Sequence, residues 1–194
     1  MQHYVTGDVA PRAPVYLPDE AYAAALDALV KGCVDVLLVH NTTGASDATS
    51  APEWHVLLGR RHVDPQPGWW FLGGRMVPFE APMDTAARHT ARDTGLALPP
   101  GTFTFLRVAS YAWARRKQAP VERGTADVAL TYYAAVTASQ RHAVANKAEE
   151  EYAEMAWRPL TAPLWEDGSL HPALRDALRE LADALARRSG GRAS

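Results

Sequence analysis

The segment WFLGGRMVPFEAPMDTAARHTARDTGL, residues 70–96, combines a glycine pair, a turn and a short helix. The helix is expected to run from Pro82 or Met83 to Thr94 and to end at Gly95, because proline suits a first helical turn and glycine suits the position after the last. Such an element can present carboxylates and arginines to a diphosphate held on a metal ion. The spacing is set by Gly74, then Glu80 after five residues, Arg88 after seven more, and finally Asp93, Gly95 and Leu96.

The composition favours one globular domain with a substantial core, since 47% of the 194 residues are hydrophobic and 22% are charged. The 20 basic and 22 acidic residues give a net charge of -2, so no overall field favours nucleic acid or an anionic membrane as partner. Recognition of an anion must therefore come from a local group of side chains.

The chain has one cysteine, Cys33, which excludes an internal disulfide bond and a cysteine-based zinc site. Residues 1–13 lack the apolar stretch of a signal peptide, and no window approaches the roughly 18 apolar residues of a membrane span. We therefore expect a cytoplasmic protein with a small-molecule substrate and with no nucleic-acid or membrane partner.

The pattern predicts an extended, proline-rich arm over residues 1–18, a core over 19–165 and a C-terminal helix within 171–188. Asp19 is expected to cap a helix from Glu20 to Lys31. Apolar runs predict strands, the first two of which can pair as a hairpin: 33–39, 54–59, 69–72, 102–111, 127–137 and 153–157. Residues 41–52 read as a flexible loop and 115–123 as a basic loop, for which solvation is favoured over a contact with phosphate.

The last predicted helix, 172–187, has an apolar face of leucines at helical spacing: Leu174, Leu178, Leu181 and Leu185. Strands and helices alternate without the regular order of a parallel sheet. This favours an α+β sandwich in which a mixed sheet lies between helices.

The spacing over residues 74–96 resembles the Nudix box, whose pattern is Gly, five residues, Glu, seven residues, Arg-Glu-apolar-x-Glu-Glu-x-Gly-apolar. The positions that match it are Gly74, Glu80, Arg88, Gly95 and Leu96. Where the box has its acidic cluster, this chain has His89, Arg92 and Asp93, so a single, shorter carboxylate remains. The resemblance implies the Nudix fold, an α/β/α sandwich with a mixed central β-sheet.

Over most of its length the chain looks like the GDP-mannose mannosyl hydrolases, a Nudix branch that also lacks most of the acidic cluster and cleaves at the sugar carbon. The likeness rests on residues 17–20 with Tyr22, on 33–35 and Asn41, on 57–61, on 68–75, and on Arg88 followed by Asp93. It implies a metal-dependent hydrolase of a nucleoside diphosphate sugar that forms homodimers.

The same resemblance implies site residues. A single Mg2+ (or Mn2+) ion would be bound at the positions of Asp93 and the Gly73 carbonyl. The family's glutamine ligand and histidine base fall near Glu151 and Tyr152. Residues that would contact substrate or take part in catalysis are Asp35, Arg61, Arg75, Arg88 and Tyr133.

The residues support much the same site without the family. Planar guanidinium groups suit the oxygens of a diphosphate. Asp93 lies in the last helical turn, where the helix dipole disfavours an anion unless a cation compensates it. His89 lies four residues earlier on the same face, and either both side chains bind a metal or they form a hydrogen-bonded pair. Glu80 is a further candidate ligand.

The acidic run at 149–151 is usually a solvated feature in proteins. A box with one carboxylate needs more oxygen ligands, however, and Glu151 is the candidate by position, both as a ligand and as a group acting on water. Tyr152 is a poor base, since an unperturbed phenol titrates near pH 10.

Three functions remain open: a hydrolase of nucleoside diphosphate sugars that attacks carbon, a Nudix pyrophosphohydrolase that attacks phosphorus, and a non-catalytic nucleotide-binding protein. The second normally needs several carboxylates that hold more than one metal ion. The helix predicted over 20–31 exposes Leu26, Leu29 and Val30, so we expect a homodimer with Asp35 near its interface, unless this helix packs on its own sheet.

Overall fold

The computed structural model describes residues 2–9, 13, 15–43 and 52–190. Pro11 and Pro14 of the predicted arm, and residues 44–51 of the predicted flexible loop, lie outside the described residues. The described part of the arm, up to Pro18, contains no helix or strand.

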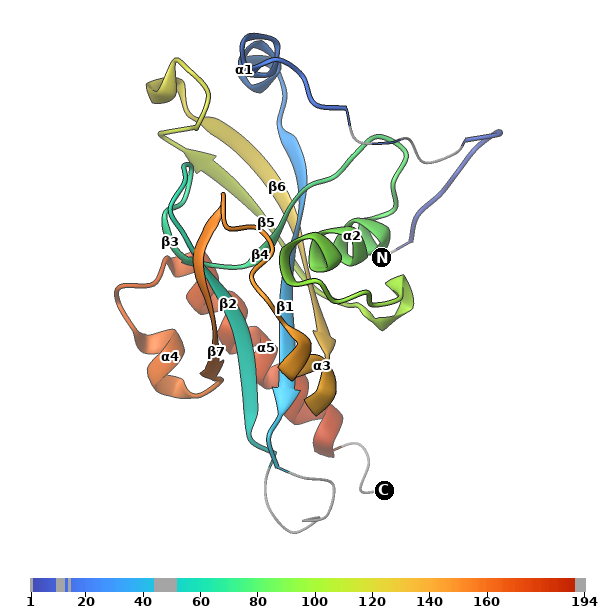
Figure 1. The fold of residues 1–194 in the computed structure, drawn as a ribbon, viewed down its shortest axis with the longest axis vertical. Coiled ribbons are helices and arrows are strands. Elements are labelled where there is room, and N and C mark those ends of the chain that lie inside the picture. The colour runs from blue at the N-terminus through green and yellow to red at the C-terminus, as the bar shows by residue number, and fades with distance from the viewer. Residues whose placement is uncertain (1, 10–12, 14, 44–51, 191–194) are drawn as a thin grey trace.

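The described residues form a mixed sheet of seven strands (Figure 1). The path runs β3-β2-β1-β6-β5, while β4 pairs with β1 and β7 pairs with β2. β1 and β6 are parallel, and every other pairing is antiparallel. The bounds are β1 Lys31–Asn41, β2 Trp54–Arg61, β3 Gly68–Trp70, β4 Leu72–Arg75, β5 Thr104–Trp113, β6 Thr125–Ala135 and β7 Tyr152–Pro159.

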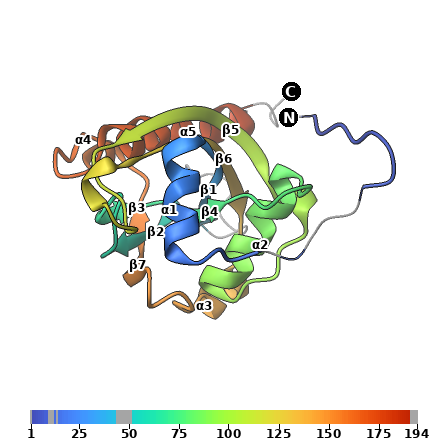
Figure 2. The same cartoon turned by 90° about the horizontal axis from the view of Figure 1, so that it is seen from above.

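Helices cover both faces of this sheet, as the view from above shows (Figure 2). One face packs against α2, Pro82–Thr94, and the other against α4, Ala162–Glu166, and α5, Pro172–Gly190. The remaining elements are α1 Asp19–Ala28, α3 Ala138–Ala143 and two short 3-10 turns, η1 Pro100–Thr102 and η2 Val121–Arg123. This arrangement confirms the predicted α+β sandwich with a mixed central sheet.

β1 is the central strand because both of its faces are apolar. Residues 34–39 are all buried, a continuous run typical of a strand covered on both sides. Val34, Val36 and Leu38 face the α2 side, whereas Leu37 and Val39 face the α5 side. The predicted pairing of β1 with β2 as an antiparallel hairpin is confirmed, with Leu38 opposite Leu57.

The box helix has the bounds predicted from the sequence. Pro82 occupies its first turn, and Gly95 ends it with a φ of 78°, a left-handed conformation that costs glycine little. The predicted leucine face of the C-terminal helix is also confirmed, since its four leucines are buried against the sheet, although α5 continues to Gly190.

Some predicted bounds were wrong. α1 ends at Ala28, because Leu29 is extended and Lys31 already begins β1. Its N-cap is Pro18, and no side chain, including that of Asp19, caps it. The strand predicted over 69–72 is two short strands, because β3 pairs with β2 and the chain then crosses to pair with β1 as β4.

Within the described part of the chain, no helix has the length and apolar content needed to cross a membrane.

The core between α5 and the sheet can be tested by Leu178→Ala, which removes a fully buried side chain. We expect the free energy of unfolding to fall by about 2–5 kcal/mol, because the cavity cannot fully collapse. Urea denaturation followed by circular dichroism measures the change. Arg179→Ala on the exposed side of α5 is the control and should cost less than about 0.5 kcal/mol. Similar small losses in both variants would contradict this packing.

Candidate active site

A cleft with a volume of about 300 Å³ lies where β4 pairs with β1. Its walls come from α1, the glycine strand β4, the strands β5 and β6, and the loop before β7. Six lining side chains carry the chemistry considered below: Asp35, Arg61, Arg75, Arg92, Tyr111 and Glu151.

The glycine pair of β4 allows the backbone to pass very close to its neighbours. Gly73 and Gly74 have φ values of 129° and 153°. A Cβ on Gly73 would lie 2.1 Å from the carbonyl oxygen of Val34, and one on Gly74 would lie 2.8 Å from the ring of His89. Larger residues are therefore excluded at both positions, and the polar groups of Gly73 are brought to the end of α2.

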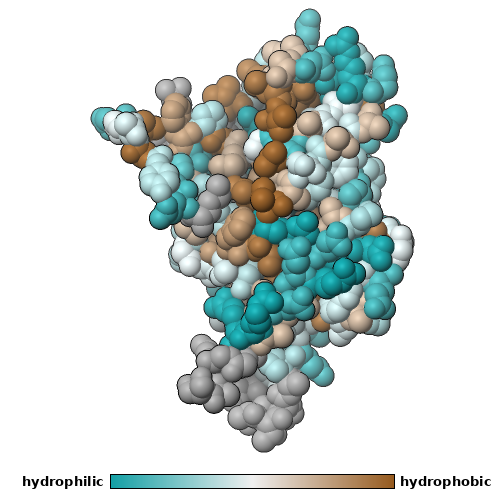
Figure 3. Space-filling model, turned by 180° about the vertical axis from the view of Figure 1, so that it is seen from behind, coloured by the Kyte–Doolittle hydropathy of each residue, from teal (hydrophilic) through white to brown (hydrophobic). Residues whose placement is uncertain are grey.

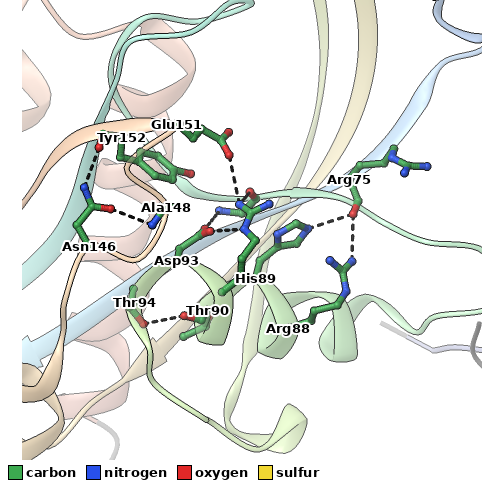
Figure 4. Close-up of polar contacts among 12 residues, drawn as sticks. Arg75, Arg88, His89, Thr90, Asp93, Thr94, Asn146, Ala148, Glu151 and Tyr152 are labelled. Carbon is green, nitrogen blue, oxygen red and sulfur yellow. Dashed lines mark hydrogen bonds and ion pairs between the residues drawn. The ribbon is translucent and has the colours of Figure 1, made fainter. Parts of the chain in front are cut away.

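Asp93 lies at that end of α2 (Figure 4), and its side chain is fully buried. One carboxylate oxygen accepts a hydrogen bond from the Gly73 N–H at 3.1 Å, and the other accepts one from Arg92 Nε at 2.5 Å. Burial raises the pKa of Asp93 to about 6, although Arg92 and the Gly73 N–H favour its charged form. The helix dipole at this acid is thus compensated by a neighbouring guanidinium group.

Arg92 is the centre of this cluster. Its Nη2 donates to the Gly73 carbonyl oxygen at 3.0 Å and lies 3.3 Å from Glu151 Oε2. The ligands predicted for a metal ion, Asp93, the Gly73 carbonyl and Glu151, therefore do come together, but around a guanidinium group.

This donor set does not fit a divalent ion while Arg92 is in place, because all three donors already bind its nitrogen atoms. Over the described residues, moreover, no three His, Cys, Asp or Glu side chains are grouped so that they could hold a metal ion.

Glu151 also contacts a second arginine. Arg61 Nη2 lies 3.2 Å from Glu151 Oε1, so this carboxylate joins Arg61 on β2 to Arg92 on α2. The Arg61 side chain is 11% exposed, and its buried Nε has no hydrogen-bond partner in the described part of the chain.

Glu80 and Arg88 form a separate ion pair that joins the turn to the helix. Arg88 Nε and Nη2 each donate to the Glu80 carboxylate at 2.7 Å, and Thr85 donates to it at 2.6 Å. Burial tends to raise the pKa of Glu80, but the bonds from Arg88 and Thr85 outweigh it and hold the pKa below its usual value. Arg88 Nη2 also donates to the Arg75 carbonyl oxygen at 3.1 Å (Figure 4).

His89 contacts the same carbonyl group from the helix. Its Nε2 lies 3.0 Å from the Arg75 oxygen, and burial, with Arg92 nearby, lowers the pKa of its ring to about 3. A neutral imidazole therefore donates its N–H to a backbone oxygen (Figure 4). The alternative pairing of His89 with Asp93 is not what the structure contains, because the carboxylate binds Arg92 and Gly73.

Arg75 faces the cleft from β4. Its Nη2 donates to the Val15 carbonyl oxygen at 3.2 Å, and its guanidinium lies 5.6 Å from the centre of the Tyr22 ring. Tyr133 lies elsewhere: its ring belongs to the core on the α5 side, and its hydroxyl accepts a bond from Arg188 at 3.1 Å. The role predicted for Tyr133 stays a prediction.

Asp35 is the buried acid on the opposite wall, paired in register with Gly73. Burial raises its pKa to about 7, and the charge of Asp127 adds to this, while Arg61 and a hydrogen bond with Tyr111 oppose it. Its Oδ2 is buried and has no hydrogen-bond partner within the described residues. This carboxyl therefore changes its charge near neutral pH.

The sequence did not point to the groups around Asp35. Asp127 forms a 3.0 Å ion pair with Lys31 and accepts a bond from the Trp113 indole at 2.9 Å. The parallel register of β1 and β6 places Lys31 opposite Asp127, and no local motif carries that register.

The prediction that the basic loop is solvated was wrong for Arg116. This side chain is 1% exposed and lies 2.6 Å from Asp27 of α1. Asp27 is a helix residue distant in sequence, so no spacing rule connects the two side chains.

The contribution of the ion pair between Arg88 and Glu80 to stability can be tested by Arg88→Ala. Glu80 would lose its charged partner while still buried, so we expect the free energy of unfolding to fall by about 1–3 kcal/mol. Arg60→Ala is the matched control, because Arg60 and Glu154 form an exposed pair, worth less than about 1 kcal/mol. Thermal and urea unfolding measure the loss of stability in both variants. An equal loss in the two would contradict a stabilising role of the ion pair between Arg88 and Glu80.

No curated protein matches the chain in sequence. Solved structures do show the same fold. A MutT protein from Methanosarcina mazei Go1 has a TM-score of 0.56 and 18% identity, over 80% of this chain and 94% of that one. An Ap4A hydrolase of C. elegans in a binary complex has a TM-score of 0.54 and 14% identity, over 81% of this chain and 98% of that one.

A MutT/nudix family protein from Enterococcus faecalis has a TM-score of 0.50 and 19% identity over 77% of this chain, which spans 47% of the length of that protein. At these identities the likeness shows the fold alone. The sequence model of the NUDIX domain, in contrast, matches residues 34–181, from β1 into α5 and well over half of the chain. The chain therefore belongs to the NUDIX family, whose hydrolases generally use divalent metal ions.

Proposed function

We propose that this chain is a hydrolase of a nucleoside diphosphate sugar or a related diphosphate, in which water attacks the sugar carbon. The observation that carries the proposal is the cleft itself, where the Asp35 carboxyl, with a pKa of about 7 and one oxygen without a hydrogen-bond partner among the described residues, lies among arginine side chains. A base of this pKa suits proton transfer at neutral pH. The guanidinium groups suit a leaving diphosphate.

In this reaction every bond, proton and electron pair is accounted for by water, the substrate and the side chains of the cleft. The oxygen of water forms a bond to the sugar carbon while the bond from that carbon to the diphosphate oxygen breaks. Asp35 takes the proton of the water, and the leaving oxygen keeps the electron pair. Arg61 and Arg75, which line the cleft, stabilise the negative charge that develops on the diphosphate.

Attack at phosphorus is the less favoured alternative. It normally relies on clustered carboxylates that hold more than one metal ion. In the box of this chain, His89 is a buried neutral ring, Arg92 is a cation and Asp93 is bound to that cation. The alternative of a non-catalytic nucleotide-binding protein is supported by the engagement of Glu151 with two arginines, because each of its carboxylate oxygens is already paired with a cation.

The reaction can be tested with a panel of nucleoside diphosphate sugars and dinucleoside polyphosphates in oxygen-18 water, with the products identified by mass spectrometry. Label in the free sugar is expected. Label in a phosphate product would instead support attack at phosphorus, and binding without turnover would support a nucleotide-binding protein.

The role of Asp35 predicts a pH profile. Because burial raises its pKa, the base form is present above about pH 7 and is lost as the pH falls through that value. We expect kcat/KM to follow this loss, and Asp35→Asn to lower kcat by roughly 10²- to 10⁴-fold. Asp127→Asn removes a neighbouring negative charge, so it should move the acidic limb to lower pH without abolishing turnover. A profile unchanged in Asp127→Asn would contradict the assignment.

We also propose that the chain forms a homodimer. Hydrophobic residues form a band on one face of the molecule (Figure 3). α1 buries Ala23 and Leu26 on its own chain, but Leu29 and Val30, which follow it, are 66% and 61% exposed. On the neighbouring strands, Val108 is 55% and Val128 is 40% exposed. A twofold contact is the commonest way to cover such side chains.

Sedimentation equilibrium at micromolar concentration should therefore give the mass of a dimer. The double variant Leu29→Glu, Val30→Glu should give a monomer with the same circular dichroism spectrum, because both side chains are exposed in a single chain. A monomeric unsubstituted protein would rule out the dimer.

A further inference from the structure

Arg92 lies at the centre of a group of oxygen atoms whose negative charge requires a cation between them. Asp93 and Glu151 provide two carboxylates and Gly73 provides a carbonyl, all within 3.3 Å of the guanidinium nitrogen atoms. Burial works against the charge of this side chain, but Asp93 and Glu151 outweigh it and hold the pKa of Arg92 above its usual value. The guanidinium group is therefore a permanent cation.

A divalent ion and this guanidinium group compete for the same donors. Magnesium requires oxygen ligands at about 2.0–2.1 Å in a nearly octahedral arrangement. Asp93, Glu151 and the Gly73 carbonyl each already bind Arg92 through one oxygen, and the two cations would repel each other.

The same guanidinium group has donors left for a ligand. Its Nε and Nη2 are engaged, but Nη1 has no hydrogen-bond partner in the described part of the chain. The side chain is 38% exposed and lines the cleft together with Arg61 and Arg75. Three arginines thus face a space where a diphosphate, with its two or three negative charges, would be neutralised.

We propose that Arg92 takes the place of a divalent ion at Gly73, Asp93 and Glu151, and that its Nη1 binds the diphosphate, so that nucleoside diphosphates bind without metal. The second half of this inference rests on the proposed function, whereas the first half concerns the ligand-free protein. The arginine both holds the acidic groups in place and contributes the positive charge.

The box pattern supplies a variant that reverses the arrangement. Arg92 stands where the box has a glutamate, so Arg92→Glu would place a third carboxylate beside Asp93, Glu151 and the Gly73 carbonyl. A set of hard oxygen donors of this kind suits magnesium or manganese. Replacement of one residue should therefore create a metal site.

The first measurement is Mn2+ binding to the ligand-free protein by electron paramagnetic resonance. The unsubstituted chain should show no binding below the millimolar range, and Arg92→Glu should bind Mn2+ at micromolar concentration. The double variant Arg92→Glu, Asp93→Asn should lose that binding. Arg60→Glu, at an exposed position on β2, should gain none. Micromolar Mn2+ binding to the unsubstituted chain would overturn the inference.

The second measurement is the affinity for GDP by calorimetry, with either EDTA or Mg2+ present. The unsubstituted chain should bind GDP equally well under both conditions. Arg92→Ala should weaken binding in EDTA about ten- to a hundredfold, the effect of losing a charge-assisted contact. Loss of GDP binding on addition of EDTA to the unsubstituted chain would contradict the inference.

The two measurements separate this inference from the proposed function. If GDP does not bind under either condition, the proposed function fails, while the Mn2+ titrations still decide what occupies the acidic cluster. Circular dichroism of each variant shows whether it is folded. If the Arg92 variants do not fold, the two measurements on the unsubstituted chain, Mn2+ binding and the effect of EDTA on GDP, decide the question alone.

Discussion

The site depends on the close contact between the glycine strand β4 and the central strand β1. Gly73 pairs with Asp35, and its Cα passes so near the Val34 carbonyl that a Cβ would lie 2.1 Å from that oxygen. This approach lets one residue donate its N–H to Asp93 and accept a bond from Arg92. The end of α2 is thereby fixed against β1, and Arg92 in turn fixes the loop before β7 through Glu151.

Electrostatics divides the cleft into two sides. On the α2 side, the acids are matched by arginines: Glu151 lies between Arg61 and Arg92, and Asp93 binds Arg92. On the other side, Asp35 is buried near a second acid, Asp127, and one of its oxygens has no partner. Desolvation and like charge both favour the protonated form there. The paired acids are suited to positioning and the unpaired one to proton transfer.

The sequence was sufficient wherever a local rule sets the structure. Pro82 and Gly95 fixed the ends of the box helix, and the leucines at helical spacing fixed the buried face of α5. It was insufficient for short elements. α3 was not predicted although Thr137 and Gln140 form a capping box, because six residues give too little periodicity. The single strand predicted over 69–72 failed because strand pairing, and not composition, divides it at Phe71.

For the site, the sequence alone determined which residues could be near one another on α2 and the glycine turn, since their spacing along one helix is fixed by 3.6 residues per turn. Asp93, the Gly73 carbonyl and Glu151 were grouped by the resemblance to the mannosyl hydrolase branch and not by this spacing, and the structure brings them together. Only the tertiary structure decided what lies between them, because the direction of the Arg92 side chain depends on contacts from three separate elements. The same holds for Asp35: its neighbour Asp127 is set by the parallel register of β1 and β6, and its pKa follows from burial that no local pattern encodes.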